Sequence, residues 1–212
     1  MKNKITYLLI VSIFAATLTS AQTTEDPREK FDAGIKAGIN ASNVWNAEGE
    51  NFRADTKLGI AAGVFAGIPI GKFLGIQPEL LLSQKGFQGS GTLLSTNYSY
   101  VRTTSYIDVP IQLQLKPLPF FTILIGPQYS YLFHQKDEYH FGLNSYDQEQ
   151  EFNNENIRKN ILGFTGGVDL MYHSLVVSGR AGLDFQTNNG NGTHTTPKYQ
   201  NRWVQFTIGF KL

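Results

Sequence analysis

Apolar and polar side chains alternate along most of this chain, in segments long enough to cross a bilayer when tilted. The stretch GIQPELLLSQKGF, residues 75–87, is representative. Its apolar face holds Ile76, Pro78, Leu80 and Leu82, and its other face holds Gln77, Glu79, Leu81, Ser83 and Lys85. Because side chains alternate across a β-strand, this pattern predicts a strand that is apolar on one side and charged on the other.

Eight segments of this kind follow one another, and no helical periodicity competes with them. They are residues 31–42, 57–68, 75–87, 105–116, 120–134, 161–172, 175–186 and 202–212. The links between them alternate in length. The short links are residues 69–72, 116–119 and 173–174, and the long polar links are residues 43–56, 86–104, 135–160 and 187–201.

In an up-and-down meander, every second connection emerges at the same end of the sheet. The alternation therefore places short turns at one end and long loops at the other, which is the layout of an outer-membrane barrel. An even strand number leaves both termini at the periplasmic end. The pattern predicts an all-β fold: an eight-stranded antiparallel up-and-down transmembrane β-barrel over residues 31–212, located in the cell outer membrane.

The first residues have the pattern of a secretory signal peptide. Lys2 and Lys4 form a positive n-region, residues 7–18 form a short apolar h-region, and Thr19-Ser20-Ala21 offers a cleavage site. We expect a signal peptide over residues 1–21 and a periplasmic N-terminal tail over residues 22–30. The chain has no cysteine, which excludes a lipoprotein anchor and disulfides.

The charge balance gives no sign of nucleic-acid binding. Removal of Lys2 and Lys4 with the signal peptide leaves 16 basic residues, of the chain's 18, against 17 acidic ones. The remaining chain suits one domain, and we expect a monomer.

The orientation of the apolar faces separates two classes of protein. In a soluble lipocalin-like barrel these faces would point inwards, around a lipid or another ligand. In a membrane barrel they face lipid, and the charged faces line an interior barely wide enough for side chains. Aromatic residues near strand ends would then form interfacial girdles. They are Phe31, Tyr106, Phe120, Phe121, Tyr131, Phe133, Tyr172, Phe185, Trp203 and Phe210.

On the membrane interpretation, seven charged residues share the inward register. They are Lys36, Glu79, Lys85, Asp108, Asp169, Arg180 and Asp184. An isolated buried charge is costly, and both signs are present. We therefore expect a structural network of ion pairs and hydrogen bonds that plugs the lumen of a non-porin barrel; a proton or ion path is the alternative role.

Three motifs carry a resemblance to a known family. GIQPELLLSQKG, YIDVPIQLQLKP (106–117) and ILIGPQYSYLF (123–133) occur in the order and spacing of the Bacteroidetes outer-membrane β-barrel domain often labelled PorT-like. The end of the chain, with alternating Phe206, Ile208, Phe210 and Leu212, resembles the signal read by the barrel-assembly machinery, although its last residue is Leu and not Phe or Trp. The resemblance implies the fold and the location. One branch of the family takes part in protein secretion and gliding.

Nothing in the chain indicates catalysis, a cofactor or a metal site. Of the four histidines, His134 and His140 lie near Asp137 and Glu138, but no nucleophile motif accompanies them. His173 and His194 lie elsewhere. We expect a structural or partner-binding protein, not an enzyme. Its acidic link 135–160 also contains aromatic residues, which makes it a candidate surface for a protein or glycan partner or for contact with lipopolysaccharide.

Overall fold

A computed structural model describes residues 26–48, 54–93, 96–141, 144–149, 157–189 and 198–212. The elements are a short 3-10 helix η2 (Pro27–Glu29) and the strands β1 (Asp32–Glu48), β2 (Asp55–Pro69), β3 (Leu74–Leu93), β4 (Thr96–Leu118), β5 (Phe121–Phe141), β6 (Asn144–Glu149), β7 (Asn160–Tyr172), β8 (Leu175–Asp184) and β9 (Lys198–Lys211). Among the described residues, no helix is long and apolar enough to cross a membrane. The predicted signal peptide lies outside the described residues.

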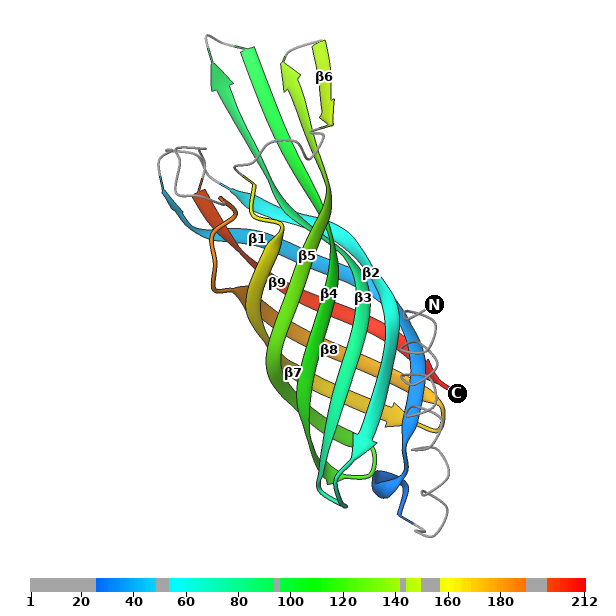
Figure 1. Ribbon diagram of the computed structural model, residues 1–212. Helices are drawn as coiled ribbons and strands as arrows, with labels where there is room; N and C mark the ends of the chain where they lie inside the picture. Colours follow the sequence, from blue (N-terminus) through cyan, green and yellow to red (C-terminus); the bar gives the residue numbers. More distant parts are fainter. Residues whose placement is uncertain (1–25, 49–53, 94–95, 142–143, 150–156, 190–197) are drawn as a thin grey trace, which may run out of the picture.

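The strands form a closed antiparallel barrel. The sheet order is β4-β3-β2-β1-β9-β8-β7-β5-β6, and an additional pairing between β4 and β5 closes the cylinder. Within the described part of the chain, β6 pairs with β5 alone, so eight strands make the barrel wall and β6 lies beyond it. Figure 1 shows the strands tilted around a common axis. The predicted eight-stranded up-and-down barrel is confirmed.

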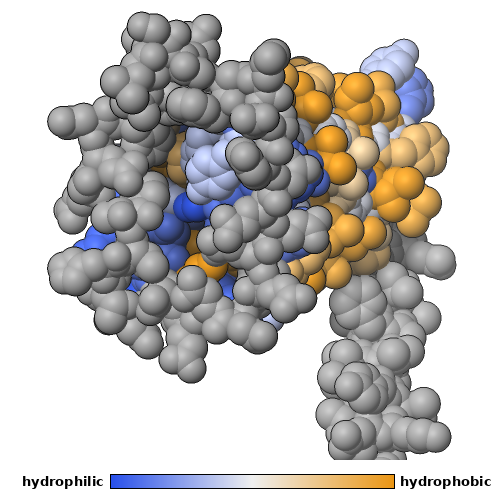
Figure 2. Space-filling view, turned by 90° about the horizontal axis from the view of Figure 1, so that it is seen from above, coloured by the Kyte–Doolittle hydropathy of each residue, from blue (hydrophilic) through white to orange (hydrophobic). Residues whose placement is uncertain are grey.

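Side chains alternate between the outer wall and the interior. On β1, Ile35 and Ile39 are 55% and 51% exposed, whereas Lys36 and Asn40, the residues that follow them, are 4% and 0% exposed. The view along the barrel in Figure 2 shows hydrophobic residues on the outer wall and hydrophilic ones within. The lipocalin-like alternative is wrong, because a soluble barrel would bury its apolar face and expose its charges.

Two of the predicted long loops are instead largely strand. β3 and β4 stay paired from Phe87↔Arg102 to Leu93↔Thr96, and β5 continues to Phe141 and pairs with β6. These extensions rise above the rest of the barrel in Figure 1. We call them the upper sheet: residues 87–93, 96–102, 136–141 and 144–149. The sequence pattern missed them because these segments show no sustained alternation of apolar and polar residues.

Two aromatic residues predicted for the girdles lie inside the barrel. Tyr106 is 1% exposed and Trp203 is 5% exposed. The physical reason is parity, because Tyr106 is two residues from inward-facing Asp108 and Trp203 precedes outward-facing Val204. Six of the predicted girdle residues are exposed on the outer wall: Phe120, Tyr131, Phe133, Tyr172, Phe185 and Phe210.

The segment before β1 packs against the short-turn end of the barrel. The Lys116 ammonium donates a hydrogen bond to the Arg28 carbonyl oxygen at 3.2 Å, and the Lys72 ammonium lies 3.2 Å from an Asp26 carboxylate oxygen. Hydrogen bonds from the Arg28 side chain and backbone hold the pKa of Asp26 well below its usual range. The described part of the predicted tail, residues 26–30, therefore meets the barrel at this end.

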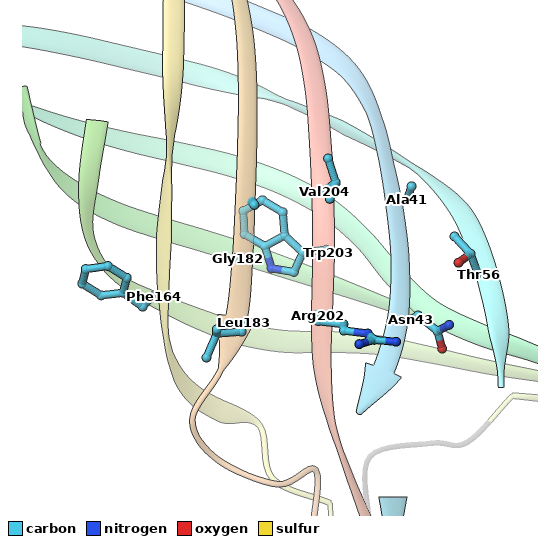
Figure 3. A pocket seen from close by; sticks show the side chains of 10 residues that line it. Ala41, Asn43, Thr56, Phe164, Gly182, Leu183, Arg202, Trp203 and Val204 are labelled. Atoms are coloured by element: carbon cyan, nitrogen blue, oxygen red, sulfur yellow. The ribbon is translucent and has the colours of Figure 1, made fainter. Parts of the chain in front are cut away.

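A shallow groove opens on the outer wall near the long-loop end, with a volume of about 480 Å³. We call it the outer groove (Figure 3). It is lined by Ala41, Asn43, Thr56, Phe164, Ala181, Gly182, Leu183, Arg202, Trp203 and Val204. These residues come from β1, β2, β7, β8 and β9, which are neighbours in the barrel wall.

Candidate functional site: the charged barrel interior

All seven predicted interior charges face the lumen and are at most 4% exposed. β1 contributes Lys36, β3 contributes Glu79 and Lys85, β4 contributes Asp108, β7 contributes Asp169, and β8 contributes Arg180 and Asp184. Each residue takes its place from strand alternation alone, because every second side chain points into the closed barrel. The structure gathers them into two clusters.

The turn-side cluster contains Lys36, Glu79, Asp169 and Arg180. Glu79 forms ion pairs with Lys36 and with the Arg180 guanidinium, the latter at 3.5 Å. Arg180 also pairs with an Asp169 oxygen at 2.7 Å. The Gln77 amide donates to Glu79 at 2.7 Å. Two cations and two anions thus neutralise one another inside the barrel, as buried charges require.

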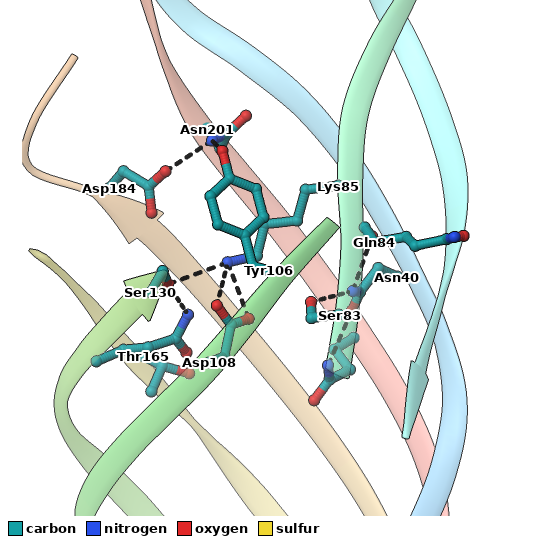
Figure 4. A network of polar contacts seen from close by, with 12 residues as sticks. Asn40, Ser83, Gln84, Lys85, Tyr106, Asp108, Ser130, Thr165, Asp184 and Asn201 are labelled. Atoms are coloured by element: carbon teal, nitrogen blue, oxygen red, sulfur yellow. Dashed lines mark hydrogen bonds and ion pairs between the residues drawn. The ribbon is translucent and has the colours of Figure 1, made fainter. Parts of the chain in front are cut away.

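The loop-side cluster is centred on Lys85 (Figure 4). The Lys85 ammonium lies 2.9 Å from one Asp108 oxygen and 3.1 Å from the other. The Asn201 amide donates to Asp184 at 2.7 Å and to the Tyr106 hydroxyl at 3.3 Å. Tyr106 also presents its ring face to the Lys85 ammonium, 4.8 Å from the ring centroid. The cluster therefore combines ion pairing with cation–π contact.

Uncharged polar side chains extend these contacts across the interior. The Gln205 amide donates to the Asn40 oxygen at 2.9 Å, and the Asn40 amide donates to the Ser83 hydroxyl at 2.8 Å. These residues come from β9, β1 and β3, so the hydrogen bonds link β1 to its neighbour β9 and, past the intervening β2, to β3. They fill part of the interior with hydrogen-bonded polar groups.

A third cluster escaped the sequence analysis because its residues fall in the segments predicted as loops. The Arg102 guanidinium holds Asp137 with two hydrogen bonds, of 2.8 Å and 2.6 Å. The rings of Phe87, Tyr100 and Tyr199 lie within 6 Å of the Arg102 guanidinium carbon, at 5.8, 5.5 and 5.9 Å. We call Arg102, Asp137 and these rings the rim cluster.

Of the two charged residues in the rim cluster, Arg102 could have been placed inside the barrel from the sequence. Arg102 has the parity of inward-facing Tyr106 and Asp108, so continued alternation places it inside. Asp137 does not have the parity of inward-facing Ser130, because the pairing of β4 with β5 shifts by one residue between Ser105 and Tyr106. The extra residue lies on β5, so it reverses the faces of β5 beyond it and leaves those of β4 unchanged, and no local signal in the sequence marks it.

The acidic residues beside His134 and His140 in the sequence pair with cations of the same strands or their neighbours. Asp137 points inwards to Arg102, and Glu138 pairs with Lys136 at 2.9 Å. His173 occupies the β7–β8 turn with its ring against Tyr172. His194 lies outside the described residues. Over the described ranges, no group of three or more His, Cys, Asp or Glu side chains is arranged to hold a metal ion.

Comparison with known families agrees with this geometry. A model described as "Outer membrane protein beta-barrel domain" matches residues 20–187, well over half of the chain. The chain belongs to this family. A member of the family with an apolar outer wall and a polar interior is an outer-membrane protein, and the end with the upper sheet is the extracellular end because the short turns of such barrels face the periplasm.

Several solved outer-membrane barrels are similar to this chain at low sequence identity. Ail, the attachment invasion locus protein of Yersinia pestis, is 10% identical with a TM-score of 0.46, and the match covers 85% of this chain and 98% of Ail. Neisserial surface protein A is 11% identical with a TM-score of 0.46, covering 85% and 97%. The outer membrane protease OmpT from Escherichia coli is 8% identical with a TM-score of 0.37, covering 91% and 100%. No curated protein matches the sequence.

Proposed function

We propose that this protein is a non-conducting, non-enzymatic barrel that binds a partner protein at the cell surface through its upper sheet. The observation that supports the proposal is that, among the described residues, this sheet has two edges without a neighbouring strand. The pairing of β2 with β3 reaches only to Asp55↔Gln88, so the rest of β3 has β4 as its neighbour. On the other side, β6 pairs with β5 alone among the described strands.

Open strand edges expose backbone N–H and C=O groups that another chain can pair with. An extended segment of a second protein that adds to such an edge gains main-chain hydrogen bonds, and alternate side chains supply specificity. A rigid barrel below the sheet holds these edges away from the membrane, where a partner has access.

The interior supports a role without conduction. Eight strands leave an interior just wide enough for side chains, and the two clusters and the Asn40 contacts occupy it. We expect no stable single-channel steps of general-porin size when the protein is reconstituted in a planar bilayer. Reproducible steps of that size would contradict the plugged lumen. If replacing Asp108 with Leu then removed the steps, the conducting path would run through the loop-side cluster.

The partner-binding role is tested by trimming the upper sheet while keeping the Arg102–Asp137 pair of the rim cluster. Residues 88–101 are replaced by Asn-Gly, which joins the Phe87↔Arg102 pair through a two-residue hairpin turn. In a second variant, residues 138–147 are replaced by Asn-Gly, which joins the Asp137↔Gln148 pair. Both variants retain the Arg102–Asp137 contact, so we expect them to fold and to remain heat-modifiable on gels.

A photo-crosslinking residue at Ser145 in β6 then reports contacts in intact cells, and the same residue at Tyr172 in the periplasmic turn region is the matched control. We expect a discrete protein adduct from position 145 that is lost when residues 88–101 are trimmed. An adduct from both positions, or no protein adduct from position 145, would contradict the proposal. A glycan partner would give no protein adduct from position 145.

The PorT-like motifs favour a second candidate, a component of a protein secretion and gliding system. The motifs are GIQPELLLSQKG, YIDVPIQLQLKP and ILIGPQYSYLF, which lie on β3, β4 and β5. On this proposal, a strain that lacks the gene loses surface export of other proteins. Normal export in that strain, together with a position-145 adduct in the wild type, would leave surface binding as the function.

A further inference from the structure

The outer groove has a regular construction. One row of lining residues crosses β7, β8, β9 and β1: Phe164, Leu183, Arg202 and Asn43. They are joined by the cross-strand pairs Phe164↔Leu183, Leu183↔Arg202 and Asn43↔Arg202. The next row towards the membrane centre contains Ala181, Val204 and Ala41, paired in the same way. The first row has a cation between Leu183 and Asn43, and the second has small residues on each side of a valine.

The small residues explain why the wall is hollow here. Because the side chains of Ala181 and Ala41 are short, they leave a depression beside Val204 and below Phe164. Gly182 and Trp203 also line the groove, although both lie at inward-facing positions of β8 and β9. The result is a largely apolar depression of about 480 Å³, within the size range of small-ligand sites.

Arg202 stands at the border of the lipid-facing wall. Below it on β9, each outward-facing residue is apolar and more than half exposed: Val204, Phe206, Ile208 and Phe210. Above it, outward-facing Gln200 is polar. Arg202 itself is exposed, and it has no ion-pair partner among the described residues. Asn43 beside it already donates its amide to the Ala54 carbonyl oxygen at 3.2 Å.

This combination selects a class of ligand. The groove lies on a wall that faces acyl chains, so its occupant is lipid. An unpaired guanidinium at the level where headgroups begin attracts an anion, and its planar fork suits a phosphate. The groove lies at the extracellular end, where the outer leaflet is lipopolysaccharide. The alternative is an arginine that only extends to interfacial water, as long cationic side chains do at membrane borders.

We propose that the outer groove is a lipid A site: Arg202 binds a lipid A phosphate, and one acyl chain lies over Ala181, Val204 and Ala41. The site gives the barrel a specific lipopolysaccharide contact, separate from the partner-binding role of the upper sheet. It depends on the outer-membrane location of the protein and not on that role.

The test measures lipid binding to the detergent-purified full chain by native mass spectrometry. Lipid A is titrated against the wild type, Arg202→Gln and Ala181→Leu, which fills the groove without changing charge. We expect one saturable lipid A per barrel, and an affinity about tenfold lower in Arg202→Gln, which corresponds to about 1.4 kcal/mol. Ala181→Leu is expected to weaken binding as well, because the acyl chain loses its place.

Matched controls separate this site from general effects. Lys136→Gln removes a cation elsewhere on the extracellular part, and Ala62→Leu enlarges an outward-facing alanine on β2 outside the groove; both are expected to bind lipid A like the wild type. Dephosphorylated lipid A should not distinguish wild type from Arg202→Gln.

Three outcomes would overturn the proposal. They are equal lipid A affinity of wild type and Arg202→Gln, displacement of lipid A by inorganic phosphate alone, and equally tight binding of phosphatidylglycerol. Heat-modifiability of each variant shows that it is folded.

Discussion

Replacing Glu79 with alanine is expected to lower the free energy of unfolding by roughly 3–5 kcal/mol. Glu79 is the anion shared by Lys36 and Arg180 in the turn-side cluster, and it is almost completely buried. Its removal leaves Lys36 without its counter-charge in the interior, whereas Arg180 keeps Asp169 at 2.7 Å. The measurement is urea unfolding in lipid vesicles, followed by heat-modifiability or fluorescence.

Leu80 provides the matched control, because it is the next residue along the strand and faces the other way. It is 51% exposed on the outer wall, so Leu80→Ala should cost less than Glu79→Ala, since lipid occupies the space that the side chain leaves. Leu80→Arg should cost roughly 2–4 kcal/mol if residue 80 lies near the bilayer midplane. A silent Glu79→Ala beside a badly destabilised Leu80→Ala would overturn the membrane orientation, because that order belongs to a soluble barrel.

Asp137→Ala is expected to destabilise the protein by a similar amount, roughly 3–5 kcal/mol. The Asp137 side chain is 1% exposed and accepts two hydrogen bonds from Arg102. Alanine there leaves a guanidinium enclosed by aromatic rings without its anion. Urea unfolding in vesicles measures this loss as well.

Glu138→Ala is the adjacent comparison. Glu138 also forms an ion pair, with Lys136, but its side chain is 32% exposed, and exposed pairs contribute about 0–1 kcal/mol. Equal effects of the two alanine variants would contradict the rim cluster. If residues 135–160 were one solvated loop, both variants would be nearly silent.

The barrel itself was predictable because its signals are local. In β1 and β9, alternation of apolar and polar residues identifies the strand and its two faces. The alternation of short and long links shows which end of the barrel is periplasmic and which is extracellular. The prediction failed where those signals are absent. The polar residues of β6 and of the upper parts of β3 and β4 carry no apolar stripe, so they resemble loop sequence although they pair as strands.

The interior charges were partly predictable for the same reason. Parity within each strand places Lys36, Glu79 and Arg180 inside, and the energetic cost of buried charge predicts that they pair. Parity counted further along β4 would also have placed Arg102 inside. The outer groove gave no comparable signal, because Arg202 and Ala181 meet only through the pairing of β8 with β9.

The amino-acid sequence by itself determined the strand period, the two faces of each strand and the need to neutralise a charged interior. These properties depend on neighbouring residues and on solvation. Only the tertiary structure decided the partners: that Glu79 lies between Lys36 and Arg180, that Asp137 reaches Arg102, and that Arg202 borders a groove. Partners across strands depend on register, on closure between β4 and β5 and on the shift beside Tyr106, and a shift of one residue exchanges inside for outside.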